Sequence, residues 1–181
     1  MRSIKFTPLV LLLVVLFAKA QAAPFSLQSS SEQQGQFVQE KHLAVLTQPF
    51  ITKGTYHYQS EAGLIWHTQH PVESLLRITT DGVSERQAEG HFKSLTTNSQ
   101  FSELLLALFS GKQQSLQQQF SIEQQDNTLT LTPKSTQIAS IILEISVLIE
   151  DNQIQKIVLR EPEGNYTNIF LSQLDSSEQG Q

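Results

Sequence analysis

Apolar and polar residues alternate along most of the chain, and turn residues separate the alternating runs. Such alternation over about four to eight residues is typical of half-buried β-strands, because successive side chains point to opposite faces of a sheet. Proline cannot donate to a strand ladder and glycine tolerates positive φ, so Pro49, Gly63 and Pro71 favour turns at the breaks. The pattern predicts strands over residues 37–46, 51–59, 64–69, 73–79, 116–124, 128–132, 140–150, 154–160 and 166–174.

One segment, residues 98–110, has helical spacing instead. Its apolar side chains recur at i, i+3, i+4, i+7 and i+8, which predicts a helix with one apolar face. They are Phe101, Leu104, Leu105, Leu108 and Phe109. Thr97 and Gln100 have the spacing of a capping box, and Gly111 stands where a helix commonly ends. The chain therefore combines many strands with one well-defined helix.

The N-terminus has the three parts of a secretory signal peptide: Arg2 and Lys5, an apolar run over residues 9–17, and small residues over 18–23. The run is shorter than the roughly 20 apolar residues that a membrane-spanning helix needs. We expect residues 1–22 to be removed, with cleavage after Ala20 or Ala22. The mature protein would then be soluble.

The rest of the chain has the length of one domain, expected over residues 23–175. Residues 24–36 are rich in serine and glutamine, and they predict either a short helix packed on the sheet or a loose arm. Residues 176–181 have nothing apolar to bury and are expected to be a disordered tail.

Charge and cysteine content exclude some classes of protein. Removing the signal peptide takes away three cations, Arg2, Lys5 and Lys19, and no acids, so the formal charge changes from −5 to −8. An acidic domain is a poor partner for nucleic acid, which needs a basic face. The chain has no cysteine, so it can form no disulfide and carry no lipid on an N-terminal cysteine.

No catalytic pattern stands out. The chain has no Gly-x-Ser-x-Gly elbow and no glycine-rich phosphate loop. His67 and His70 are three residues apart near a strand end, where alternation would place them on opposite faces, and a zinc site usually needs three or four convergent ligands. We therefore expect neither a metal, nor another cofactor, nor enzymatic activity. A hydrolase of the cell envelope is kept as an alternative class of function.

Three blocks of sequence carry a resemblance to a known family. They are Phe37-x-Gln39-x-Lys41, then Gly63-Leu64-x-Trp66, then Ile154-x-Lys156-Ile157-x-Leu159 followed by Gly164-x-Tyr166-x-Asn168-Ile169. In this order, after a signal peptide, they resemble the LolA family of periplasmic carriers, which move lipoproteins between the two membranes of Gram-negative bacteria. The resemblance covers nearly the whole mature chain.

The resemblance implies an α+β fold: an incomplete antiparallel β-barrel, or curved sheet, with helices packed on or in its concave face. It implies a soluble, monomeric periplasmic carrier that shields acyl chains of a lipoprotein or other lipid in an apolar cavity. Its partners would be an inner-membrane exporter and an outer-membrane acceptor. The alternative is a non-enzymatic envelope adaptor or binding module with the same fold and a filled cavity.

The helix over residues 98–110 would close this cavity. The residues expected in its lipid-binding wall are Tyr56, Tyr58, Leu64, Trp66, Leu75, Leu104, Leu105, Leu108, Ile141, Leu143 and Ile145. Two of these assignments have simple alternatives: Tyr56 and Tyr58 also suit a surface cross-strand pair, and residues 140–150 also suit an ordinary core strand.

The chain departs from the family at one place. In well-known carriers an arginine before the tryptophan strand holds the lid helix, whereas this chain has Gln59-Ser60-Glu61-Ala62 there. Either another residue, such as Arg77 or Arg86, holds the helix or the chain lacks this contact. The cargo is left open between general lipoproteins and a lipid from a dedicated pathway.

Overall fold

The computed structural model describes residues 29–96 and 99–173. The expected signal peptide, Thr97 of the expected capping box, and the expected tail over residues 176–181 lie outside the described residues.

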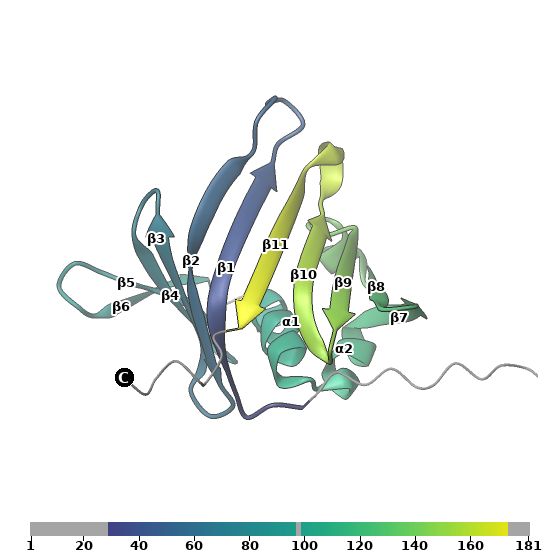
Figure 1. Cartoon of the computed structure of the whole chain (residues 1–181), viewed down its shortest axis with the longest axis horizontal. Helices are drawn as coiled ribbons and strands as arrows, with labels where there is room; N and C mark the ends of the chain where they lie inside the picture. Colours follow the sequence, from purple (N-terminus) through teal and green to yellow (C-terminus); the bar gives the residue numbers. More distant parts are fainter. Residues whose placement is uncertain (1–28, 97–98, 174–181) are drawn as a thin grey trace, which may run out of the picture.

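One antiparallel sheet of 11 strands runs through the described residues (Figure 1). The strands are β1 (Glu32–His42), β2 (Phe50–Gln59), β3 (Gly63–His70), β4 (Ser74–Thr79), β5 (Gly82–Arg86), β6 (Phe92–Thr96), β7 (Phe120–Gln125), β8 (Thr128–Pro133), β9 (Glu144–Glu150), β10 (Gln153–Arg160) and β11 (Tyr166–Gln173). Their spatial order is β6-β5-β4-β3-β2-β1-β11-β10-β9-β8-β7. The first and last strands thus pair in the middle, and within the described residues the sheet stays open at β6 and β7.

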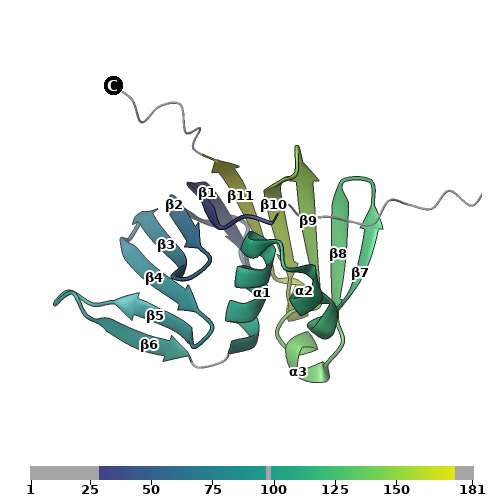
Figure 2. The ribbon, with the colours of Figure 1, turned by 90° about the horizontal axis from the view of Figure 1, so that it is seen from below.

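Helices lie on the concave side of the sheet. They are α1 (Ser99–Ser110), α2 (Gln113–Gln119) and the short α3 (Thr136–Ala139). Figure 2 shows the two halves of the sheet on either side of α1. The expected fold, an incomplete antiparallel barrel with helices in its concave face, is confirmed.

Aromatic side chains join β1, β2, β3 and α1 in the core. The rings of Phe37 and Trp66 stack with centroids 3.9 Å apart. Phe109 of α1 lies against Tyr56, with ring centroids 5.2 Å apart, and near Tyr58. All five side chains are buried or nearly so. Alternation directs the four strand residues to the concave face, and Phe109 lies on the face of α1 that packs against them.

The strand expected over residues 116–124 is wrong at its start, since the helix α2 occupies Gln113–Gln119 and the strand begins at Phe120. Leu116 is buried on α2, which contacts α1 and β7. One buried leucine among glutamines gives no period from which helix and strand can be told apart, and tertiary packing decides the outcome.

The strand expected over residues 140–150 also begins too early. Ser135 caps α3 by accepting a hydrogen bond from the backbone N–H of Ile138, and the N–H of Ile142 donates to the Ile138 carbonyl. The chain is therefore still turning at residues 140–143, and β9 starts at Glu144. As a result Ile141 and Leu143 are exposed and do not continue the buried face of Ile145 and Val147.

Two further differences concern strands that the pattern did not predict. Residues 32–36, assigned to a short helix or a loose arm, form the beginning of β1. Residues 82–86 and 92–96 form β5 and β6, which carry the sheet to its edge. Both strands are short and have few apolar residues, so alternation alone gives little indication of them.

Candidate functional site

A cleft of about 440 Å³ lies between the concave face of the sheet and helix α1. Its lining comes from both halves of the sheet, from α1 and from the segment between α3 and β9. The lining residues are Gln39, Lys41, Trp66, Leu76, Ile78, Leu105, Ile141, Ile142, Leu159, Glu161, Thr167 and Ile169. The site is thus mainly apolar, with polar groups from β1, β11 and the residue after β10.

Strand register explains how distant parts of the sequence meet here. Gln39 of β1 lies opposite Ile169 of β11, and Thr167 of β11 lies opposite Leu159 of β10. On the other side, Trp66 of β3 lies opposite Leu76 of β4. Residues opposite each other in a sheet share a face, so the members of each of these pairs face the cleft together.

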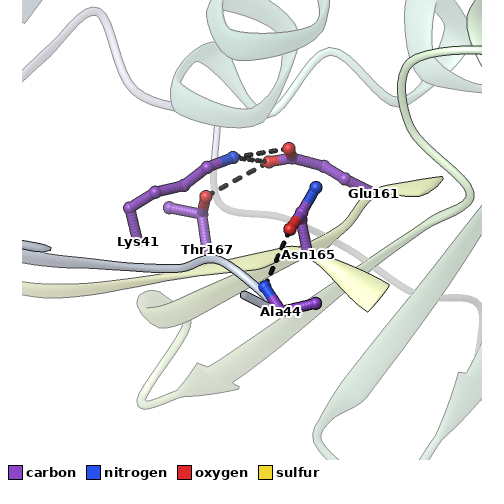
Figure 3. Close-up of polar contacts among 5 residues, drawn as sticks. All are labelled: Lys41, Ala44, Glu161, Asn165 and Thr167. Atoms are coloured by element: carbon purple, nitrogen blue, oxygen red, sulfur yellow. Dashed lines mark hydrogen bonds and ion pairs between the residues drawn. The ribbon is translucent and has the colours of Figure 1, made fainter. Parts of the chain in front are cut away.

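The polar part of the lining forms an ion pair. The Lys41 ammonium group contacts both carboxylate oxygens of Glu161 at 2.5 Å, and the Thr167 hydroxyl donates to Glu161 at 3.2 Å (Figure 3). We call these three residues the rim cluster. Lys41 and Glu161 are each about a quarter to a third exposed, so water reaches the cluster. The cluster neutralises its own charge and offers polar hydrogen-bonding groups beside an apolar surface.

Three of the predicted cavity residues, Trp66, Leu105 and Ile141, line this cleft. Others lie outside its lining and are buried in the core: Tyr56, Tyr58, Leu64, Leu104, Leu108 and Ile145. Burial raises the pKa of Tyr56 to about 12. These tyrosines therefore do not form a surface pair.

Two predicted residues lie elsewhere. Leu75 is opposite His67 across the β3–β4 pair, whereas its neighbour Leu76 is opposite Trp66, so Leu75 is on the other face of the sheet. Leu143 is half exposed and does not line the cleft. In both cases the position in the apolar run was ambiguous, and the strand register, or the turn before β9, fixed the direction of the side chain.

Several residues that line the cleft were not predicted, although the sequence pattern indicated their inward faces. The alternation of Ile157 with Leu159, and of Ile169 with Leu171, already indicated inward faces on β10 and β11. Lys41 shares a face with Phe37, four residues earlier on the same strand. The pairing of Lys41 with Glu161 joins residues 120 positions apart, and no local pattern predicts it.

Helix α1 is held to the sheet by a side chain that the sequence did not single out. The Gln33 side-chain amide on β1 donates a 2.7 Å hydrogen bond to the backbone carbonyl of Phe109. Arg77, one of the two suggested alternatives, instead lies over the Phe92 ring of β6, 4.1 Å from its centroid. Arg86 is exposed at the end of β5. The contact to the helix backbone therefore comes from Gln33.

Other hollows are less suited to apolar ligands. One of about 390 Å³, near the turn between β2 and β3, is lined by several polar groups, including Glu61, Glu103, Lys112 and Gln118. Among residues 29–96 and 99–173, no three His, Asp or Glu side chains are placed to hold a metal ion. No helix in the described part of the chain is long and apolar enough to cross a membrane.

Comparisons with known proteins give one family and a set of distantly similar solved structures. The family model described as outer membrane lipoprotein carrier protein LolA matches residues 28–181. A DUF1329 family protein from Desulfovibrio piger is similar at 11% identity and a TM-score of 0.44, over 81% of this chain and 85% of that one. An outer membrane lipoprotein-sorting protein domain from Vibrio parahaemolyticus gives 8% identity and a TM-score of 0.41, over 82% and 88%. Comparison with curated proteins gave no match.

Proposed function

The chain belongs to the LolA family of outer membrane lipoprotein carriers, and on this premise we propose that it shields acyl chains of a lipoprotein, or of another lipid, while they cross the periplasm. Carriers of this family are periplasmic and non-enzymatic. The observation that carries the proposal is the apolar cleft of about 440 Å³ between the sheet and α1.

The size and lining of the cleft suit this role. Its volume lies within the range of roughly 300–1,000 Å³ that is usual for small-molecule sites. Exposing hydrocarbon to water costs about 0.8 kcal/mol per methylene, so a chain of roughly 15 methylenes would cost about 12 kcal/mol without shelter. The apolar side chains of Trp66, Leu105 and Ile169 offer that shelter.

The rim cluster suits the polar end of such a ligand. Acyl esters and amides carry carbonyl oxygens, which accept hydrogen bonds from an ammonium or side-chain amide group. Lys41 and Gln39 supply such donors at the polar side of the cleft. Since Lys41 is already paired with Glu161, the rim cluster can bind a ligand that carries no net charge.

The alternative role as an envelope adaptor requires a cavity filled by side chains. The cleft counts against it, because space remains between α1 and the sheet. The N-terminal pattern supports export, with residues 1–22 removed as a signal peptide. An inner-membrane exporter would then load the carrier, and an outer-membrane acceptor would unload it. We take the working unit to be a monomer.

The test uses the delipidated protein and a fluorescent fatty-acyl probe below its micelle concentration. The Ile142→Trp variant fills the cleft with a larger side chain, and we expect it to lose most probe uptake. Leu143→Trp is the matched control, because Leu143 is the next residue, is half exposed and lies outside the lining. It should take up the probe like the unmodified protein.

Two results would count against the proposal. If native mass spectrometry finds no lipid on the purified protein and the probe is not taken up, the carrier role is wrong. If Ile142→Trp binds the probe as well as Leu143→Trp does, the ligand occupies another place.

A further inference from the structure

Exposed apolar side chains gather at one end of the sheet. In an antiparallel sheet, β1, β3 and β10 end where β2, β9 and β11 begin, so the loops between these ends lie on one side of the molecule. Val45, Leu46, Phe50, Val72 and Leu143 all belong to this end, and between 46% and 89% of each residue is exposed. Apolar groups gathered on a surface in this way commonly mark a contact with another protein or with a membrane.

The hairpin between β1 and β2 projects farthest at this end (Figure 1). Residues 43–52, which we call the hairpin tip, contain no charged side chain. Val45 is 89% exposed and Phe50 is 59% exposed. The hairpin tip therefore presents exposed apolar side chains without any charge of its own.

The hairpin tip is held firmly in place. The backbone N–H of Ala44 donates to the Asn165 side-chain oxygen at 3.0 Å (Figure 3). At the base of the tip, the rings of His42 and Tyr166 stack with centroids 4.2 Å apart. The Lys41–Glu161 ion pair links β1 to the residue after β10. The exposed apolar side chains therefore stand on a braced element.

The brace also connects the hairpin tip to the cleft. Lys41 and Glu161 line the cleft, and the tip begins two residues after Lys41. Ile141 lines the cleft too and is 56% exposed, so the cleft opens to solvent at this same end. Whatever the tip contacts is thus brought to the opening of the cleft.

We propose that the hairpin tip inserts its apolar side chains into the interface of a lipid bilayer and places the cleft opening at the membrane surface. This proposal rests on the proposed function, in which the carrier is loaded at one membrane and unloaded at the other. The absence of charge over residues 43–52 favours a bilayer over a protein surface, where charged and hydrogen-bonding groups usually set specificity. The charges beside the tip balance, because Lys41 is paired with Glu161, and Glu40 and Lys53 carry opposite charges. The attraction is therefore hydrophobic and does not need anionic lipid.

The absence of native cysteine allows the contact to be measured at single sites. A Val45→Cys variant carrying an environment-sensitive dye should gain intensity and shift to shorter wavelength when neutral phosphatidylcholine vesicles are added. Lipids with a nitroxide near the headgroup should quench it. The control is Ala62→Cys, an exposed site in the turn between β2 and β3 at the opposite end of the sheet. Its dye should not change.

A second pair of variants tests the energetics. Val45→Glu combined with Leu46→Glu should lower co-flotation with vesicles by roughly tenfold or more, because two apolar side chains would no longer leave water. Leu95→Glu, the same kind of change at a single exposed leucine on β6, should leave flotation unchanged. Uptake of the acyl probe from solution needs the cleft and no bilayer, so it should be normal in both variants. Failure of uptake in the unmodified protein would refute the carrier role and leave the membrane measurement intact.

The proposal is overturned if the dye at Val45 keeps its aqueous emission with vesicles and the double variant floats as the unmodified protein does. If the dye emission changes only with vesicles that contain envelope membrane proteins, the tip binds a protein partner and the proposal is overturned.

Discussion

Replacing Gln33 by methionine should loosen helix α1 without altering the sheet. The Gln33 amide donates to the Phe109 carbonyl in the last turn of α1, where helix carbonyls lack partners within the helix. Methionine keeps the length of the side chain and removes the donor. Phe109 is only 1% exposed, so water cannot easily replace the lost partner.

The size of the effect follows from the hydrogen bond. A net contribution of about 1 kcal/mol is usual, and an unsatisfied buried acceptor raises the cost to about 1–3 kcal/mol. Since about 1.4 kcal/mol is a factor of ten, opening of α1 should become at least roughly fivefold more frequent. The β-strand amides of the core should change much less, because the bond joins α1 to one residue of β1.

Native-state hydrogen exchange, followed by mass spectrometry on peptides from α1, measures this opening. Gln36→Met is the matched control, because Gln36 is exposed on the opposite face of the same strand. If the α1 amides of Gln33→Met exchange within twofold of those in the control, the reasoning is wrong. The packing of Phe109 against Tyr56 would then hold the helix by itself.

Three further predictions concern stability. Because burial raises the pKa of Tyr56 to about 12, the folded protein binds this proton more tightly than the unfolded chain, so stability should fall as pH rises from about 10 to 12. In urea unfolding, the free energy of unfolding of Tyr56→Phe should therefore fall by about 2 kcal/mol less over this pH range than that of the unmodified protein. Gly54→Ala should destabilise the fold by about 1–3 kcal/mol in the same assay, because the added Cβ would clash with the His67 backbone across the β2–β3 pair. A urea midpoint of Gly54→Ala equal to that of the unmodified protein would contradict this. Lys41→Met should cost about 1 kcal/mol by leaving the half-buried Glu161 without its cation, and the cost should shrink at high salt. The same loss in 1 M salt would indicate packing rather than charge.

The strands around β1–β4 and β8–β11 were largely predictable, because each has a buried and an exposed side that alternation records directly. The helix α1 was predictable for the same reason, with five apolar residues at helical spacing. Where one leucine lies among glutamines, as at Leu116, or where strands are short, as in β5 and β6, the local pattern is too weak to choose an element.

The candidate site was predictable only in part. Trp66 and Leu105 line the cleft as expected, since each lies on an apolar face that must turn inward. The choice between Leu75 and Leu76 depended on register, because a shift of one residue sends a strand side chain to the other face. Leu143 lost its expected place when the capped turn of α3 delayed the start of β9.

The sequence by itself determined the family, the antiparallel strands and the apolar faces, because these depend on residue order over short distances. Only the tertiary structure decided that β1 lies beside β11, and so that Lys41 meets Glu161 and that Gln33 reaches the end of α1. The position of the hairpin tip beside the cleft opening was decided in the same way. Such contacts join residues far apart in the chain, and they exist only once the sheet has curved around the helix.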